Sequence, residues 1–522
     1  MIQALSRILE LSDFDEQQRS MVKLITEMQS TNPTELSQIL ELLHDYAGLD
    51  FGPTNKKWPQ LVGLLVSKIA QIHQKSALSW SPPMLQRVAE IYDLVPDDEN
   101  LRNQLLGLLA AVGTESALGI WEKRLCEAPP QIRSGIALAF APLMHHEANL
   151  TQSLFDQLFT RALGHLPVAA AVLDLANYAY RAGILDPHPA LGRVEQLSEL
   201  LGHLAAQMER IEEGNIPEAW DPAQISQTVS DAVALMIPLC DAMALIEHHP
   251  AIGKLNQTLG LRHRRLQTEA AAALAKMGDE NGRKALIGLA EHPNVRTRVL
   301  AYADELGLGS QISLEYQGDI ATAEAHLATW LCEPEQMGIA PSEMTLLDNR
   351  ELNWPSYEHP IHCYLFQYTY GKGENAYRNV GISGPLTHAF AADINQLSKL
   401  ATYAAFAGWQ TTHQEVFSLP FERAAEAMPG IVSGLLRLMN EQEYVGLQPV
   451  ALGGFFGEYQ LVASGKTQDA PSSIHGTLIL NEEQADWIEA GNPDAPIDWQ
   501  LALDIWRGQR LLANFNSLEQ FG

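Results

Sequence analysis

Apolar residues recur at steps of three and four along residues 1–308, the spacing that places them on one face of an α-helix. Two examples are LSQILELLHDYAGL at 36–49 and LVGLLVSKIAQI at 61–72. Short clusters of Pro, Gly, Asn and Asp interrupt this pattern, and such residues end helices and form turns. We therefore predict an all-helical array over 1–308, with short connections between its helices.

Four helical segments in this part repeat one another. The segment VRTRVLAYADELG at 295–307 aligns with LQTEAAAALAKMG at 266–278, 29 positions upstream. The same order of small and apolar positions occurs in LRNQLLGLLAAVG at 101–113 and IRSGIALAFAPLM at 132–144, which are 31 positions apart. Repeated helical units cannot bury an apolar face alone, so they are expected to stack. At this spacing, residues 145–265 leave room for about four more helical pairs.

Each of these segments resembles the second helix of a HEAT repeat, in particular the short form found in phycobilin-lyase-like proteins. In such repeats an apolar residue followed by Arg begins the helix, small residues let neighbouring helices approach, and Gly ends the helix. The matching structural repeat positions are Arg102, Arg133, Arg296, Gly113, Gly278 and Gly307. Gln267 stands at the Arg position of one copy, and Met144 at the Gly position of another. The resemblance implies an armadillo-like helical α-solenoid, and Gly fits a helix end because the terminating residue usually needs a positive φ.

The pattern changes after residue 308. Aromatic and β-branched residues predict a strand at 361–370 and its hairpin partner at 376–383, across a Gly-rich turn. Further segments of this part predict two more helices and more strands, at 394–409 and 498–515 for the helices, and within 444–464 and at 476–480 for the strands. The fold class is therefore mainly α, an α-solenoid of HEAT-like helical repeats over 1–308 followed by a smaller α+β domain over 320–522.

Three connections stand out in this scheme. The boundary between the two domains is expected at 308–320. A long surface loop is expected at 333–357, and an acidic loop that projects from the array at 208–224. We find no family resemblance for the α+β domain.

Composition fits a folded protein of the cytoplasm. Apolar residues make up 46% of the 522 residues and charged residues 19%. The four cysteines have no paired spacing, so neither a disulfide framework nor a zinc site is expected. The N-terminus lacks a basic start followed by an apolar core, and no run of about 18 apolar residues occurs, so we expect neither a secretory signal nor a membrane span.

The net charge of −29 limits the partners of this chain. After residue 310 there are 9 Lys and Arg against 26 Asp and Glu, and before it 25 against 37, so both parts are acidic. Binders of phosphate backbones need clustered cations, so neither a nucleic acid nor a membrane surface is an expected partner. A protein partner of basic or mixed charge is the expectation instead.

The predicted strand at 361–370 carries one aromatic-rich face, which includes Tyr368 and Tyr370. Together with Arg378 these two residues are candidate binding residues, because a row of aromatic rings on a sheet can stack on a ligand. Burial against a helix is the more frequent use of such a face, and it is the interpretation we favour.

Candidate catalytic residues cluster in ISGPLTHAFAAD, where Ser383, His388 and Asp393 supply nucleophile, base and acid types. A Ser-His-Asp triad is defined by geometry, and the sequence lacks the GxSxG motif of a nucleophile elbow. The glycines of GKGEN at 371–375 lack the third Gly of a dinucleotide-binding loop, so a hairpin turn explains them better. His362 and Cys363 point to opposite faces of a strand, so we expect no metal and no cofactor.

Three functions remain open. The first is a non-catalytic protein–protein interaction scaffold, in which the α+β domain is a second binding module. The alternative is an enzyme of hydrolase or lyase type, with its active site in the α+β domain and the array recruiting the substrate. The family resemblance implies a third function, chromophore attachment or lyase-type chaperoning.

Overall fold

The computed structural model describes residues 1–11, 13–47, 58–130, 133–145, 147–217, 219–373, 375–467, 474–489 and 498–516. The chain forms two compact units, Met1–Leu286 and Ile287–Gly522. The first unit is helical, and the second is a smaller α+β unit, so the fold is mainly α as the pattern predicts.

The division between the units falls inside α15 (Glu280–Leu289), upstream of the change in pattern at 308–320. The reason lies in the next two helices. Helix α16 (Pro293–Glu305) packs against α17 (Asp319–Leu331), and α17 packs on strands of the second unit. Both helices therefore belong to the second unit.

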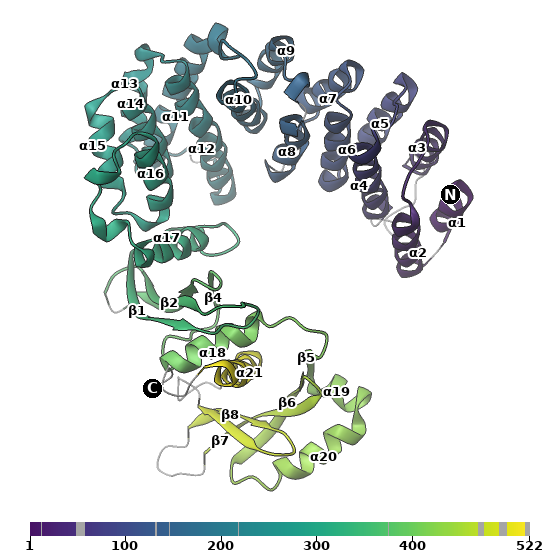
Figure 1. The fold of residues 1–522 in the computed structure, drawn as a ribbon, viewed down its shortest axis with the longest axis vertical. Coiled ribbons are helices and arrows are strands. Elements are labelled where there is room, and N and C mark those ends of the chain that lie inside the picture. Colours follow the sequence, from purple (N-terminus) through teal and green to yellow (C-terminus); the bar gives the residue numbers. More distant parts are fainter. Residues whose placement is uncertain are drawn as a thin grey trace. The chain divides into compact units, whose positions relative to one another are not determined.

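The helices of the first unit pack in an alternating order. In chain order they are α1 (Ile2–Leu9), α2 (Phe14–Glu27), α3 (Pro33–Ala47), α4 (Trp58–Ser76), α5 (Pro82–Leu94), α6 (Glu99–Val112), α7 (Glu115–Glu127), α8 (Arg133–Phe140), α9 (Gln152–Ala162), α10 (Leu166–Arg181), α11 (Val194–Glu212), α12 (Pro222–Leu245), α13 (Ile252–Leu259) and α14 (Arg264–Lys276). Each even-numbered helix from α2 to α12 packs against the next even-numbered one. Odd-numbered helices from α1 to α9 do the same, as do α11 and α13, so two rows of helices run side by side (Figure 1).

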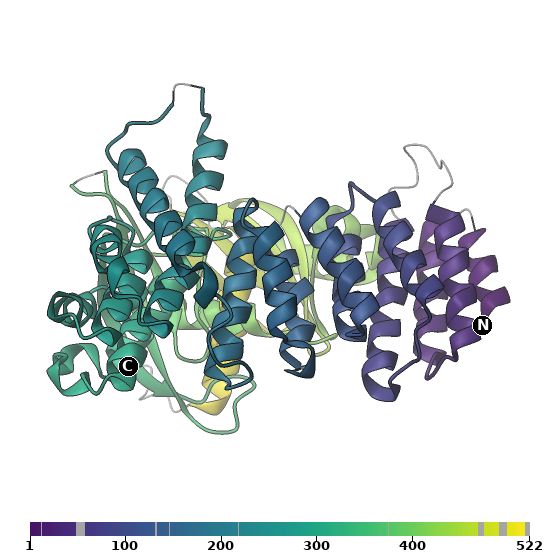
Figure 2. The same cartoon turned by 90° about the horizontal axis from the view of Figure 1, so that it is seen from above.

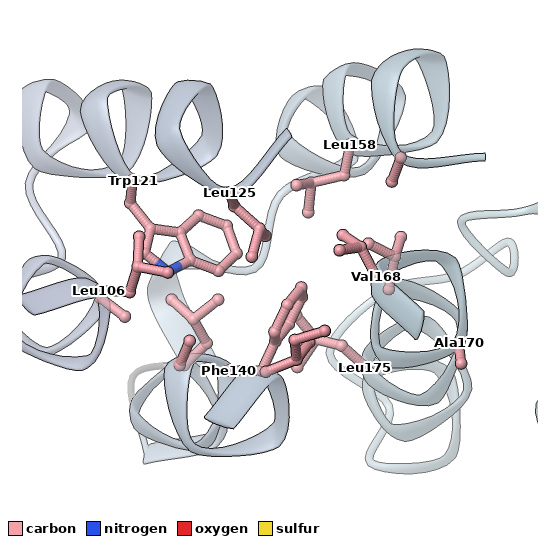
Figure 3. Packing of buried hydrophobic residues seen from close by; sticks show 14 of the residues in the cluster. Leu106, Trp121, Leu125, Phe140, Leu158, Val168, Ala170 and Leu175 are labelled. Atoms are coloured by element: carbon pink, nitrogen blue, oxygen red, sulfur yellow. The ribbon is translucent and has the colours of Figure 1, made fainter. Parts of the chain in front are cut away.

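Apolar side chains fill the space between the two rows. Trp121 of α7 is fully buried, and its ring meets Phe140 of α8 edge to face, with the ring centroids 4.9 Å apart. Leu106 of α6 and Leu158 of α9 continue the same core on either side (Figure 3). The core is therefore continuous from one helical pair to the next.

Glycines end three of the repeated helices, as the sequence predicts. Gly113 follows α6 with φ +65°, Gly278 follows α14 with φ +84°, and Gly307 follows α16 with φ +67°. A residue with a Cβ is strained at these positive φ values, so glycine is the natural helix terminator.

Residues 145–265 differ from the prediction of about four helical pairs. The described residues there contain five α-helices, α9 to α13, because two of them are long: α11 has 19 residues and α12 has 24. These helices also extend into both ends of the segment 208–224 that was expected to be a loop. The loop ends at Asp221, because Asp221 and Gln224 exchange hydrogen bonds in a capping box that begins α12. The shorter connection that remains extends beyond the neighbouring helices (Figure 2).

Among the described residues, α12 is the one helix that is long and apolar enough to cross a membrane by length and composition. Half of that apolar stretch is buried, and α12 packs against α10, α11 and α14. A long core helix meets the same criterion of length and composition.

The described residues of the second unit form two antiparallel sheets. Sheet A has the order β1 (Glu343–Leu352), β2 (Ile361–Tyr370), β3 (Tyr377–Ser383), β4 (His388–Ala389), and sheet B has the order β5 (Val416–Pro420), β6 (Val445–Phe455), β7 (Glu458–Lys466), β8 (His475–Leu480), β9 (Ala485–Glu489). The helices, besides α16 and α17, are α18 (Lys399–Gln410), α19 (Phe421–Ala427), α20 (Pro429–Met439) and α21 (Trp499–Phe515). Strands that follow each other in the chain are neighbours in both sheets.

Helices and sheets alternate as layers in this unit. Tyr364 and Phe366 of β2 pack with α17, whereas Cys363 and Leu365 pack with α18 and α21 on the other face of sheet A. Helix α21 also packs on one face of sheet B, and α20 covers the other face. The predicted strand at 361–370, its hairpin partner and the packing of its aromatic face are thus confirmed.

The surface loop expected at 333–357 is wrong in part, because β1 lies within it. β1 is an edge strand and is mostly half-buried or exposed, so its sequence lacks a strong apolar alternation. A bulge between Leu346 and Asp348 shifts the register with β2 and breaks the two-residue period further.

Helices α18 and α21 approach unusually closely, through one glycine on each. A Cβ on Gly408 would lie 1.9 Å from the carbonyl oxygen of Asp504, and a Cβ on Gly508 would lie 1.7 Å from that of Ala404. Only glycine leaves room for such contact between two helix backbones.

Candidate functional site

The Arg positions of the predicted repeats have a clear structural role. Arg296 is buried, and its Nε donates a hydrogen bond to the carbonyl oxygen of Ala290, six residues upstream, at 2.8 Å. Arg102 reaches the carbonyl oxygen of Pro96, also six residues upstream, at 3.4 Å, and that of Ala128 at 2.5 Å. Each guanidinium therefore satisfies carbonyls at the ends of neighbouring helices, which have no partner within their helix.

A glutamine performs the same role in two other helices. The side-chain Nε2 of Gln267 donates to the carbonyl oxygen of Leu261 at 2.7 Å, and that of Gln17 donates to Leu11 at 2.7 Å. Both acceptors again lie six residues upstream. Gln267, a departure from the Arg pattern, thus keeps the contact, whereas the side chain of Arg133 lies outside the described residues.

A buried polar chain connects α10 with α12 in the first unit. Nδ1 of His188 accepts from the backbone N–H of Ala190 at 3.1 Å, so the ring proton is on Nε2, which donates to Oδ1 of Asn177 at 3.0 Å. Asn177 in turn donates to Asp241 at 3.0 Å, and Arg181 pairs with the same carboxylate. Burial lowers the pKa of His188 to about 4, so the neutral ring is a structural element of this unit.

The three candidate binding residues of sheet A do not converge. Tyr368 is buried, and its ring lies 5.9 Å from that of Tyr370, on the face that packs with α17. Arg378 pairs with Thr369 in the sheet, so it belongs to the opposite face and is exposed. Burial raises the pKa of Tyr368, which is consistent with a core position.

The three candidate catalytic residues are also separated. His388 pairs with Ile382 across β3 and β4 and shares its face, so the neighbouring Ser383 belongs to the other face of the sheet. The Ser383 hydroxyl is buried and has no hydrogen-bond partner in the described part of the chain. Asp393 accepts instead from the backbone N–H of Asn395 at 3.1 Å. This geometry provides no hydrogen-bonded nucleophile and base.

Aromatic rings surround His388 rather than acids or nucleophiles. Its imidazole stacks on Trp409 of α18, with the ring centroids 3.9 Å apart, and meets Phe390 edge to face at 5.2 Å. Burial lowers the pKa of His388 to about 4. The ring is therefore neutral at pH 7 and packs as an aromatic group.

The residues considered for metal or phosphate binding belong to β2 and to the turn between β2 and β3. Gly371 and Gly373 have φ of +84° and +76°, which a tight turn requires, and Glu374 lies outside the described residues. His362 stacks on Tyr364, while Cys363 belongs to the buried opposite face. Within the described ranges no group of three His, Cys, Asp or Glu side chains is placed to hold a metal ion.

A cavity of about 360 Å³ in the second unit gathers charge and apolar surface in one place. It lies between α20 and the turns that join β6 to β7 and β8 to β9. Ile431, Leu435 and Tyr459 form its apolar wall, and Glu458, Asn481, Glu482 and Glu483 form its polar rim. We call it the acid-rimmed pocket. Its volume is within the range of small-ligand sites.

Asn481 fixes the geometry of the rim. It is 6% exposed, and its Oδ1 accepts from the backbone N–H of Glu483 at 2.9 Å and from that of Gln484 at 2.8 Å. Its Nδ2 donates to the carboxylate of Glu458 at 3.4 Å, so it connects the turn between β8 and β9 with the turn between β6 and β7. The carboxylates thus stand on turns that are already ordered.

The sequence gives only a weak signal for this pocket. Glu458 and the pair Glu482 and Glu483 each follow an apolar strand, and acidic residues are ordinary in turns. Because neighbouring strands in the order β6-β7-β8-β9 are antiparallel, the turns after β6 and β8 lie at the same end of the strands. Their proximity depends on that strand order, which a single sequence does not establish.

No protein-family model matches the chain, and a search of curated proteins yields no match.

Proposed function

We propose that the protein is a non-catalytic scaffold for protein–protein interaction. In this proposal the first unit is a HEAT-like α-solenoid, and the second unit is a further binding module. The partner is a protein of basic or mixed charge, as the net charge of −29 favours.

One observation carries the proposal, namely the alternating packing of α1 to α14. Even-numbered helices pack on even-numbered helices and odd-numbered on odd-numbered over most of the unit, which is how stacked helical hairpins bury a common core. The recurring contact from Gln17, Arg102, Gln267 and Arg296 to the sixth residue upstream supports a repeated unit.

The even-numbered row also exposes large apolar side chains. Leu64 of α4 is 40% exposed and Leu138 of α8 is 65% exposed. They belong to the two helices that flank α6, and a Cβ on Gly107 of α6 would lie 3.7 Å from the carbonyl oxygen of Leu138. Exposed leucines on the two helices that pack on α6 provide apolar area for a partner.

The enzyme alternative lacks comparable support. Ser383 and His388 belong to opposite faces of sheet A, and Asp393 is engaged by the backbone of its own loop. No specific geometry therefore favours hydrolase or lyase chemistry at these residues.

The test is affinity purification of the tagged full chain, with retained proteins identified and quantified by mass spectrometry. We expect a protein in near-stoichiometric amount that is lost from the double variant Leu64→Glu, Leu138→Glu. The matched control is Leu94→Glu, Leu191→Glu, which changes two leucines of similar exposure, 41% and 45%, outside the even-numbered row. Equal recovery from both double variants, or no protein above background, would reject the proposal.

A further inference from the structure

We propose that the acid-rimmed pocket binds an arginine or lysine side chain of the partner protein. This inference rests on the proposed scaffold function and specifies which part of a partner the second unit recognises. It depends on three features of the pocket: uncompensated negative charge, an apolar wall and a preorganised rim.

The charge of the rim has little internal compensation. Glu482 and Glu483 are exposed and form no ion pair among the residues that the structure describes. Glu458 has one cation nearby, Arg510, whose Nη1 is 3.9 Å from its carboxylate. The rim therefore carries three carboxylates, of which only Glu458 is paired with a guanidinium, and a second cation would be attracted to the rim.

The wall selects a cation with a long apolar stem over a simple ion. Ile431 and Leu435 of α20 and the ring of Tyr459 provide the surface. Arginine and lysine place their methylene groups on such surface and keep the charged group at its edge. An arginine guanidinium can also stack on the tyrosine ring.

The rim is ordered before any ligand arrives. Asn481 accepts a hydrogen bond from the backbone N–H of Glu483 and donates one to the carboxylate of Glu458, so the backbone of the turn between β8 and β9 and the Glu458 carboxylate need little rearrangement. A preorganised site loses less conformational entropy on binding. The pocket thus combines the charge, the apolar area and the rigidity that recognition of one basic side chain requires.

The test uses the full chain and the methyl group of Ile431 as a local reporter. The δ1-methyl of isoleucines is labelled with ¹³C, and the Ile431 signal is assigned from the variant Ile431→Val. We titrate Nα-acetyl-arginine amide, and in parallel Nα-acetyl-citrulline amide, which has nearly the same shape without the charge. We expect a saturable shift of the Ile431 signal with the arginine compound and none with the citrulline compound.

A charge-matched pair of variants separates the pocket from the general acidity of the chain. Glu482→Gln, Glu483→Gln is expected to weaken arginine binding about tenfold, because two carboxylates at contact distance are lost. Glu441→Gln, Glu443→Gln removes the same charge from exposed positions of the same unit that do not line the pocket, and it should change binding less than about twofold. Isoleucine methyl signals outside the pocket that match those of the wild type verify that the unliganded variants are folded.

Several results would overturn the inference: no saturable shift, an equal response to citrulline, or equal weakening in the two charge variants. If the purification experiment still yields a partner that depends on Leu64 and Leu138, the scaffold function stands while the pocket inference fails. If that partner is absent but Ile431 responds to arginine alone, the pocket binds a basic side chain and the helical array is not the docking surface.

Discussion

The close approach of α18 and α21 gives a sharp test of the packing in the second unit. Replacing Gly508 with Ala adds one methyl group at a point where it would lie 1.7 Å from the carbonyl oxygen of Ala404. A carbon and a carbonyl oxygen in contact need about 3.3 Å. The obstacle is helix backbone on both sides, so no side-chain rotation relieves it, and the two helices must separate by roughly 1.5 Å.

The magnitude follows from what that separation breaks. A gap of 0.5–1 Å already forfeits about a quarter to a half of the dispersion attraction between packed atoms. The interface includes buried Tyr403 and Phe406 of α18 and Leu501 and Ile505 of α21. Overpacking of a core costs about 1–3 kcal/mol when side chains can adjust, and here they cannot. Alanine regains about 1 kcal/mol of helix propensity, so we expect a net loss of about 3 kcal/mol.

Hydrogen exchange with mass spectrometry measures this locally, which matters because a chain with two units does not unfold in one step. The amides of α18 and α21 should exchange about a hundredfold faster in Gly508→Ala. Gly434→Ala in α20 is the control, because nothing lies within 4 Å of its Cβ position, and it should slow exchange slightly. Exchange in α21 that is unchanged, or slowed as in the control, would refute the close backbone contact.

The remaining predictions concern single buried groups. Burial lowers the pKa of His188 from 6.5 to about 4, so protonation favours the unfolded state, and the stability that this residue contributes is complete above pH 6.5 and is lost as the pH falls toward 4. In urea unfolding, the free energy of unfolding of the wild type should therefore fall by about 1–2 kcal/mol between pH 7.5 and 5 relative to that of His188→Gln. Parallel pH dependence of the two proteins would contradict this. Arg296→Met should cost about 3 kcal/mol or more in thermal or urea unfolding, because it leaves buried carbonyls and a carboxylate unpaired. Arg298→Met removes an exposed guanidinium of the same helix that lies over the Tyr302 ring, and it should cost about 1 kcal/mol or less. In ¹³C-histidine NMR, His388 should titrate near pH 4 and move toward 6.5 in Trp409→Ala, which uncovers the ring; a wild-type value near 6.5 would show that the ring is not desolvated.

Much of the local structure was predictable because its causes lie within a few residues. The glycines at 113, 278 and 307 end helices since their own φ is positive. The two faces of β2 follow from the two-residue period of a strand, and the turn after it follows from Gly371 and Gly373. Helices shorter or longer than a repeat, such as α12, were not predictable from a spacing measured elsewhere in the chain.

The candidate sites were not predictable in this way, because they depend on which distant segments pack together. Nearness in sequence grouped Ser383 with His388, yet the pairing of β3 with β4 assigns them to opposite faces. Glu458 lies near Glu482 and Glu483, more than twenty residues away in the sequence, only because the turns after β6 and β8 lie at the same end of the strands of sheet B.

By itself the sequence determined the helical first part, the mixed second part, the ends of the repeated helices and the division of β2 into two faces. Backbone preferences and side-chain periods act over about four residues, so they can be inferred directly from the local sequence. The tertiary structure alone decided that α18 and α21 touch backbone to backbone, that β1 closes the edge of sheet A, and that three carboxylates surround one apolar wall. Those outcomes depend on contacts between distant segments, as in the hydrogen bond from the backbone N–H of Asn353 to Asn516, 163 residues later, and such contacts form only when the whole unit packs.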